Sequence, residues 1–190
     1  MGVVSIVILA VIVVVLVYVI MLYNDLVQVK NNVSKAWANI DVLLKQRHDE
    51  LPKLVETCKQ YMKFEQETLQ KVTDARSRVF AARESQDIRA LGPAEAGLRA
   101  SVGNLFAVAE QYPELKTNQT FLQLQSRISG LENAIADRRE FYNESVNINN
   151  VRIEQFPGTV IAGRFNFRPA QLLEFASAEK TDVDVKDLFK

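Results

Sequence analysis

The residue types that most often carry out chemistry are scarce in this chain of 190 residues. It contains one histidine, His48, and one cysteine, Cys58. A Cys-His nucleophilic pair would need a loop to fold back over a helix, and the apolar pattern places Cys58 at a core position. We interpret Cys58 as a buried thiol and His48 as a surface residue. Lys45 stands where a Glu-x-x-His di-iron motif needs glutamate, so we expect no catalytic residues, no metal site and no cofactor.

Charged residues inside apolar stripes are the more informative polar positions. Most neighbours of Glu65 and Arg138 three and four residues away are apolar, and Asp41 and Arg47 flank the end of another stripe. Burying such charges singly is costly. We therefore predict a buried polar network of Asp41, Arg47, Glu65 and Arg138, with Glu65 and Arg138 as an example of a pair that fixes helix register. The alternative hypothesis is an anion-binding or partner-binding pocket lined by Arg47, Arg138 and Arg139.

Aromatic residues give a second set of candidates. Trp37 and Tyr142 lie at or near stripe positions, so we interpret them as core aromatics first and interface anchors second. Phe156, Phe165 and Phe167 belong to a C-terminal stretch, residues 152–190, that holds half of the ten phenylalanines. Because disordered tails are poor in aromatics, we predict that this tail packs on the rest of the chain or binds a partner.

The N-terminal region is apolar enough to cross a membrane. No charged residue precedes Asp25, and only Ser5 and Tyr18 carry polar side chains between Gly2 and Leu22. At about 1.5 Å rise per residue, this run matches a hydrocarbon layer roughly 30 Å thick. A cleaved signal peptide would need a basic N-terminal region and a small-residue cleavage site, and a core helix normally shows a polar stripe. The run therefore predicts a transmembrane anchor, residues 1–23, in contact with the lipid bilayer.

The flanking charges suggest how this anchor is oriented. The residues before it include no lysine or arginine, whereas Lys30 and Lys35 follow it closely. The positive-inside rule then favours an N-terminus outside the cell, a cytoplasmic body and a single-pass protein of the bacterial inner membrane.

The remaining sequence predicts an all-α body. Apolar residues recur every three and four positions, in one stretch at near-heptad, coiled-coil-like spacing, in four helices separated by Pro or Gly signals: 24–48, 51–88, 92–112 and 118–151. A turn or a kink is expected at Leu51-Pro52, with the turn preferred, because proline removes a backbone donor. Four such stripes are most simply buried in an antiparallel up-and-down four-helix bundle. The predicted organisation is an anchor (1–23), a bundle (24–151) and an irregular tail (152–190).

Several motifs resemble those of one family. They are YNDLV (23–27), NVSKAWANIDV (32–42), KQR (45–47), LPKLVE (51–56), YPELK (112–116), FLQLQ (121–125), LENAIADRREFYN (131–143) and FP (156–157). Their order and spacing are similar to those of the LemA family of bacterial membrane proteins, over nearly the full length. The resemblance implies a single-pass inner-membrane protein with a four-helix bundle and no established enzymatic activity.

These observations favour a function through binding rather than catalysis. Lysine plus arginine and aspartate plus glutamate both number 23, so the net charge is zero and nucleic-acid binding is disfavoured. We predict a non-enzymatic, membrane-anchored scaffold or adaptor of the bacterial envelope that forms a homo-oligomer or binds other envelope proteins. The alternative is a membrane-bound ligand or anion sensor with a polar pocket around Arg47, Glu65 and Arg138.

Overall fold

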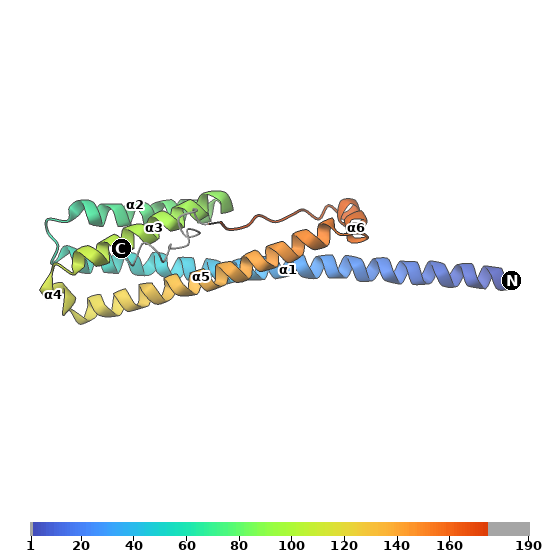
Figure 1. Cartoon of the computed structure of the whole chain (residues 1–190), viewed down its shortest axis with the longest axis horizontal. Coiled ribbons are helices and arrows are strands. Elements are labelled where there is room, and N and C mark those ends of the chain that lie inside the picture. Colours follow the sequence, from blue (N-terminus) through green and yellow to red (C-terminus); the bar gives the residue numbers. More distant parts are fainter. Residues whose placement is uncertain (1, 175–190) are drawn as a thin grey trace, which may run out of the picture. The chain divides into compact units, whose positions relative to one another are not determined.

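Every regular element of the structure, a computed structural model that describes residues 2–174, is a helix. In chain order these are α1 (Val3–Lys59), α2 (Gln66–Glu84), α3 (Ile88–Ala109), α4 (Pro113–Lys116), α5 (Gln119–Glu154) and α6 (Gly158–Phe165) (Figure 1). The all-α class is confirmed. The last part of the predicted tail, residues 175–190, lies outside the described residues.

The described residues form two compact units. The first unit comprises residues 2–40 and 137–172, and the second comprises residues 41–136 and 173–174. Helices α1 and α5 each contribute one part to both units. The predicted boundary near residue 24 is not a break in the chain's secondary structure, because α1 continues from the apolar run without interruption.

The turn predicted at Leu51-Pro52 is wrong, because α1 passes through Pro52. A proline inside a helix leaves the carbonyl oxygen four residues earlier without its donor. Here that oxygen belongs to His48, and it accepts a hydrogen bond from Nε of Arg76 at 3.0 Å. A side chain of α2 thus supplies the donor that the proline removes, and the helix continues to Lys59.

The boundaries of the next helices also differ from those predicted. Residues 60–65 are not helical, so the predicted helix 51–88 is divided between the end of α1 and α2. Helix α3 begins before Pro93, because the carboxylate of Asp87 accepts hydrogen bonds from the backbone amides of Arg89 and Ala90 at 3.0 and 3.1 Å. This N-cap satisfies two amides of the first turn. Helices α2 and α3 then pack along each other, as Figure 1 shows.

Helix α5 begins after a side-chain cap. The side chain of Asn118 accepts a hydrogen bond from the amide of Phe121 at 3.0 Å. Its own amide group donates to the hydroxyl of Tyr61 at 3.0 Å, which ties the start of α5 to the connection after α1. The short α4, which was not predicted, starts at Pro113, in agreement with the preference of proline for the first turn.

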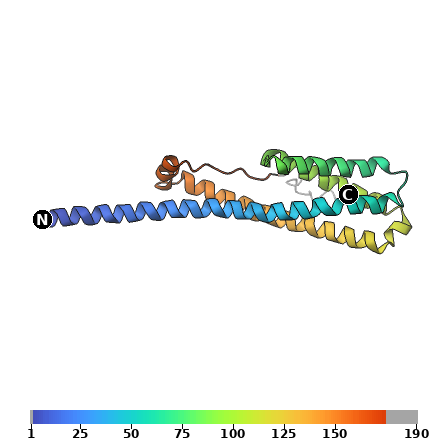
Figure 2. The same ribbon diagram turned by 180° about the vertical axis from the view of Figure 1, so that it is seen from behind.

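In the first unit, α5 runs antiparallel to α1. Trp37 of α1 contacts Tyr142 of α5, and Asp25 of α1 lies 3.6 Å from Arg152 of α5, so the pairs advance in opposite directions. Helix α6, which was predicted to be irregular tail, lies beside the C-terminal end of α5 in both views (Figures 1 and 2). It ends at Asn166, which adopts the left-handed conformation that asparagine tolerates.

The apolar part of α1 is largely uncovered by the other described residues, 23–174. Its large side chains between Val3 and Met21 are mostly half to three-quarters exposed. This segment is long and apolar enough to cross a membrane, and none of its most apolar window is buried.

Candidate functional site

A buried ion pair lies inside the second unit. The guanidinium of Arg47, on α1, donates a hydrogen bond to the carboxylate of Glu95, on α3, and both residues are only 2% exposed. The pair joins two helices through a charge-assisted contact, the stronger class of hydrogen bond. Because both charges are removed from water, each depends on the other for compensation.

A second acidic residue, Glu132 of α5, lies close to this pair. Burial raises the pKa of the Glu132 carboxyl, the positive charges of Arg47 and Arg99 act in the opposite direction, and the negative charge of Glu95 adds to the rise. Within residues 2–174, buried Oε1 of Glu132 and buried Nε of Arg47 have no hydrogen-bond partner. Two carboxylates and one fully buried guanidinium therefore share this region.

The raised pKa leads to a pH-dependent effect of removing the Glu132 charge. A glutamate in an unfolded chain titrates at about pH 4.3. Since its pKa is higher in the folded protein, the native state binds more protons between the two values, and the free energy of unfolding falls as pH rises through this interval. We expect Glu132→Gln to be more stable than the original protein at neutral pH and equal to it near pH 4. Thermal unfolding across this pH range tests the difference, with Glu140→Gln on the exposed surface of α5 as the control.

Another buried carboxylate, that of Glu50, lies about one helical turn beyond Arg47 on α1. Glu50 is buried, and its Oε1 lies 2.7 Å from the guanidinium of Arg127 of α5 and 3.2 Å from Nζ of Lys53. Its Oε2 is buried without a hydrogen-bond partner in the described part of the chain. Glu50 thus links α1 to α5 as Arg47 links α1 to α3.

A polar cluster joins α1 and α2 within the same unit. Arg83 donates from two nitrogens to the two carboxylate oxygens of Asp41, at 2.6 and 2.9 Å. The ring of His48 stacks on Phe80 with centroids 4.7 Å apart, and Arg76 lies 2.6 Å from its Nε2. Burial, and then the positive charge of Arg76, lower the pKa of His48. The histidine, interpreted from the sequence as a surface residue, is therefore half-buried and held by ring packing and by an arginine.

Three residues of the predicted polar network lie in the second unit, and each has a different partner. Asp41 pairs with Arg83, Arg47 pairs with Glu95, and Glu65 accepts a hydrogen bond from the hydroxyl of Tyr112 at 3.2 Å.

The predicted burial of Arg138 is corrected, because its side chain is exposed. Ile135 and Tyr142, the stripe positions before and after it on α5, are buried.

Sequence reasoning missed the acidic residues that matter most in the buried group. Glu95 occupies the position between Leu91 and Leu98 on the apolar stripe of α3, and all three are fully buried or nearly so. Glu132 follows Ile128 by one helical turn on α5. The signal was present in the spacing, because each of the two residues lies three and four positions from buried apolar residues of its own helix.

Cys58 is fully buried, and burial raises the pKa of its thiol to about 12. Because the thiolate is the reactive form, we expect Cys58 to remain unmodified by maleimide in the native protein at pH 7.5 and to react fully in denaturant. Intact mass measured after timed labelling distinguishes the two results. Rapid labelling of the native protein would contradict the burial.

The predicted aromatic candidates Trp37 and Tyr142 pack on each other in the first unit. Their rings meet edge to face with centroids 5.9 Å apart, and Tyr142 is buried. The hydroxyl of Tyr142 donates to the backbone oxygen of Gln171 at 2.9 Å, so this pair also holds the chain that follows α6. Two hydrogen bonds in opposite directions between the side chain of Asn150 and the backbone of Ala170 add to this attachment.

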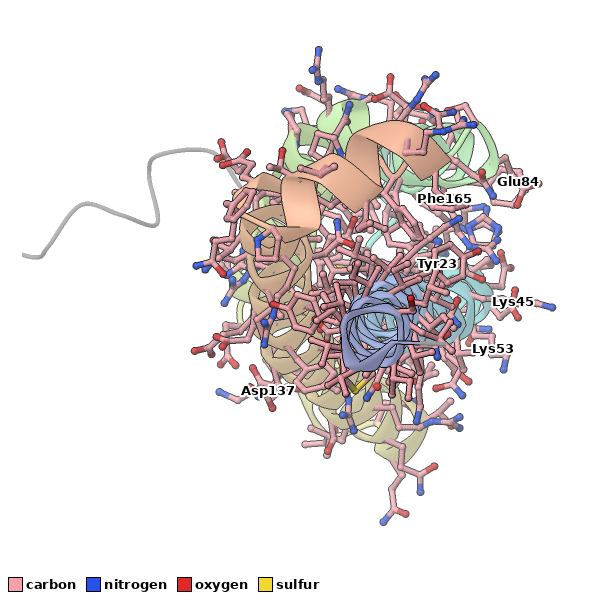
Figure 3. All side chains as sticks on the ribbon, turned by 90° about the vertical axis from the view of Figure 1, so that its right-hand side faces the viewer. Tyr23, Lys45, Lys53, Glu84, Asp137 and Phe165 are labelled. Atoms are coloured by element: carbon pink, nitrogen blue, oxygen red, sulfur yellow. The ribbon has the colours of Figure 1, made fainter. Side chains whose placement is uncertain are left out.

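The three phenylalanines of the tail differ in their surroundings. Phe156 is 83% exposed, whereas Phe165 and Phe167 contact the ring of Tyr23 edge to face, with centroids 4.9 and 5.7 Å apart. Figure 3 shows Phe165 of α6 beside Tyr23 of α1. These contacts lie just beyond the apolar run, next to a small core of Leu26, Ile161 and Ala162.

Two surface grooves occur elsewhere in the second unit. One lies between the end of α1 and the start of α2, near Val55, Met62 and Leu69, and the other lies between α2 and α3, near Ala82 and Pro93. Neither groove is lined by Arg47, Glu65 or Arg138. Among residues 2–174 no three His, Cys, Asp or Glu side chains are grouped in a way that could hold a metal ion.

Comparison with known proteins agrees with the family resemblance of the motifs. The chain is 29% identical over 169 residues to Protein LemA of Metamycoplasma hominis, covering 87% of this chain and 74% of that protein. It is also similar to Magnetosome protein MamQ 2 of Paramagnetospirillum magneticum (23% identity) and Magnetosome protein MamQ of Magnetospirillum gryphiswaldense (22%), each over 90% of this chain and 71% of the relative. The model of the LemA family matches residues 36–186, and the chain therefore belongs to the LemA family.

Proposed function

We propose that this chain is a non-enzymatic, single-pass, membrane-anchored scaffold or adaptor of the bacterial envelope, which assembles with itself or with other membrane proteins. The observation that carries the proposal is the exposed apolar segment at the start of α1. Most large side chains from Val3 to Met21 are half to three-quarters exposed. Such a surface is stable in a lipid bilayer, where an uninterrupted helix also satisfies its own backbone hydrogen bonds.

The membership of the LemA family and the match to LemA of Metamycoplasma hominis also support membrane association. For the orientation, we propose an inner-membrane protein with the N-terminus outside and the body in the cytoplasm, on the basis of Lys30 and Lys35 beyond the segment.

The body of the scaffold is proposed to be an antiparallel four-helix bundle. In the second unit, side chains of α1 contact α2 through Asp41 and Arg83 and contact α3 through Arg47 and Glu95. Helix α5 contacts α1 through Arg127 and Glu50, and it contacts α3 through the rings of Phe121 and Phe106. Contacts of one helix with three others are typical of such a bundle.

The state of the buried charges supports a structural rather than a catalytic or sensory role. Arg47, the central residue of the proposed sensor, is engaged by Glu95 inside the unit. A guanidinium that is 2% exposed and already paired is not accessible to an anion from water, so the scaffold is the better account of Arg47.

The scaffold proposal is tested by crosslinking in cells that express the full-length protein in its native membrane. We expect reproducible crosslinks to a second copy or to a specific membrane protein, identified by mass spectrometry. A chain that ends after Val151 removes α6 and the segment held by Tyr142, and it is expected to lose those links. A variant with Phe64→Ser, which changes a 95% exposed side chain between α1 and α2, tests whether the body surface contributes. Complete absence of specific links from the full-length protein would contradict the scaffold.

A further inference from the structure

Helix α6 packs on α1 at the point where the apolar segment ends. Its buried residues Ile161 and Ala162 form a core with Leu26, and Val19 and Leu22 of α1 pack against that core. Val19 and Leu22 belong to the uncharged apolar run, so α6 touches the last turn of the segment that is proposed to cross the bilayer. Its position along α1 is therefore fixed by side-chain contacts within one unit.

This position corresponds to the headgroup layer of a bilayer. Leu26 lies four residues beyond Leu22, which is about 6 Å along the helix axis. The polar layer on each side of the hydrocarbon core is roughly 5–7 Å thick. A helix that packs between Val19 and Leu26 lies at the level of that layer when the apolar run occupies the hydrocarbon core.

The residues that α6 and its N-terminal flank leave uncovered have the chemistry of a membrane interface. Phe156 is 83% exposed, Val160 is 60% exposed and Phe165 is 54% exposed. Arg164 and Arg168 are exposed beside them. Aromatic rings are enriched at the level of lipid headgroups, and arginine near the surface binds anionic phosphates. An apolar surface of this kind is costly in water.

We propose that α6 lies in the headgroup layer of the same bilayer that α1 crosses, with Phe156, Val160 and Phe165 in contact with lipid. The inference rests on the proposed membrane anchor and adds a second lipid contact to it. The observation behind it is that the core on which α6 packs is continuous with the apolar run of α1. Helix α6 then fixes the depth of the apolar segment of α1 in the bilayer and its rotation about the helix axis.

Lipid-dependent fluorescence quenching in liposomes tests this arrangement with the full-length protein. Cys58→Ala removes the single native thiol, and its effect on folding is checked by circular dichroism. A single cysteine is then placed at Phe156 or at Val160 and labelled with an environment-sensitive fluorophore. The liposomes contain phosphatidylcholine and phosphatidylglycerol, with or without lipid that carries a nitroxide near the headgroup.

Two further labelling positions make the result specific. Phe141→Cys is the matched control, because Phe141 is 55% exposed on α5 of the same unit, next to Tyr142. Tyr142 contacts Trp37, which lies 15 residues past Leu22, or roughly 22 Å along α1. Val14→Cys, labelled inside the apolar run and measured with a nitroxide deep in the acyl chain, tests the anchor itself.

We expect the headgroup nitroxide to quench the labels at positions 156 and 160 about twofold or more above the label at position 141. Equal quenching at 156, 160 and 141, together with deep quenching at position 14, would overturn the α6 inference and leave the anchor intact. Absence of quenching at position 14 would overturn both proposals. The labels at 156 and 160 could instead quench each other, to a degree that rises with protein density and does not depend on the lipid nitroxide. That result would show that the surface contacts a second copy of the chain and would overturn the lipid contact.

Discussion

Arg47→Ala is expected to lower the free energy of unfolding of the full-length protein by about 3–5 kcal/mol, because it leaves a buried carboxylate without its cation. Glu95 loses the guanidinium that it contacts, and Glu132 loses the largest favourable charge near it. Urea denaturation in detergent, followed by circular dichroism at 222 nm, measures the loss. The loss should be smaller at acid pH, where Glu132, whose pKa is raised by burial, becomes protonated and loses its negative charge.

Two comparisons make the Arg47 result interpretable. Lys71→Ala removes one partner of an exposed ion pair with Glu67 on α2 and is expected to change stability little, since both groups remain in water. The double variant Arg47→Met with Glu95→Leu replaces both charges by apolar side chains and should recover much of the lost stability. An Arg47→Ala protein as stable as Lys71→Ala would show that the pair is not buried as described.

Gly158→Ala is expected to release α6 from the end of α5. A Cβ atom added at position 158 would lie 2.6 Å from the backbone oxygen of Arg152, closer than real contacts allow. Because backbone rather than a flexible side chain stands in the way, we expect a local loss of about 1–3 kcal/mol. Hydrogen exchange measured by mass spectrometry should show faster exchange of the α6 amides in this variant.

Gly163 provides a control within the same helix. A Cβ atom at position 163 meets nothing within 4 Å, so Gly163→Ala adds only the preference of alanine for helix, roughly 0.5–1 kcal/mol of stabilisation. The two substitutions are chemically identical and should move α6 exchange in opposite directions. If both variants exchange at the same rate, the close approach of α6 to α5 is not a constraint on the fold.

The local pattern was sufficient to predict the long helices but not where they end, and it missed α4 and α6. Apolar spacing identified the all-α class and the apolar run at the start of α1. Pro52 and Pro93 were interpreted as boundaries, and both lie inside helices. A proline inside a helix is tolerated when another group satisfies the freed carbonyl, and the donor here, Arg76, is 28 residues from His48 in sequence. Such a contact is invisible to any local pattern.

The sequence predicted the type of the candidate site but not how its residues pair. The sequence indicated that charged residues are buried in the stripes, and Arg47 is buried with an ionic partner. The identity of the partner could not be predicted, because it depends on the alignment of α3 against α1.

The hydrogen bond between Arg76 and the backbone of His48 has a consequence for the order of folding. Alone, the end of α1 would contain a proline and an unsatisfied carbonyl, and a helix is expected to fray or bend at such a point. Once α2 docks, Arg76 donates a hydrogen bond to the backbone oxygen of His48, and the residues on both sides of Pro52 form one continuous helix. We therefore expect the last turns of α1 to become ordered late in folding, after α2 has docked. Release of α2 would allow α1 to bend at Pro52.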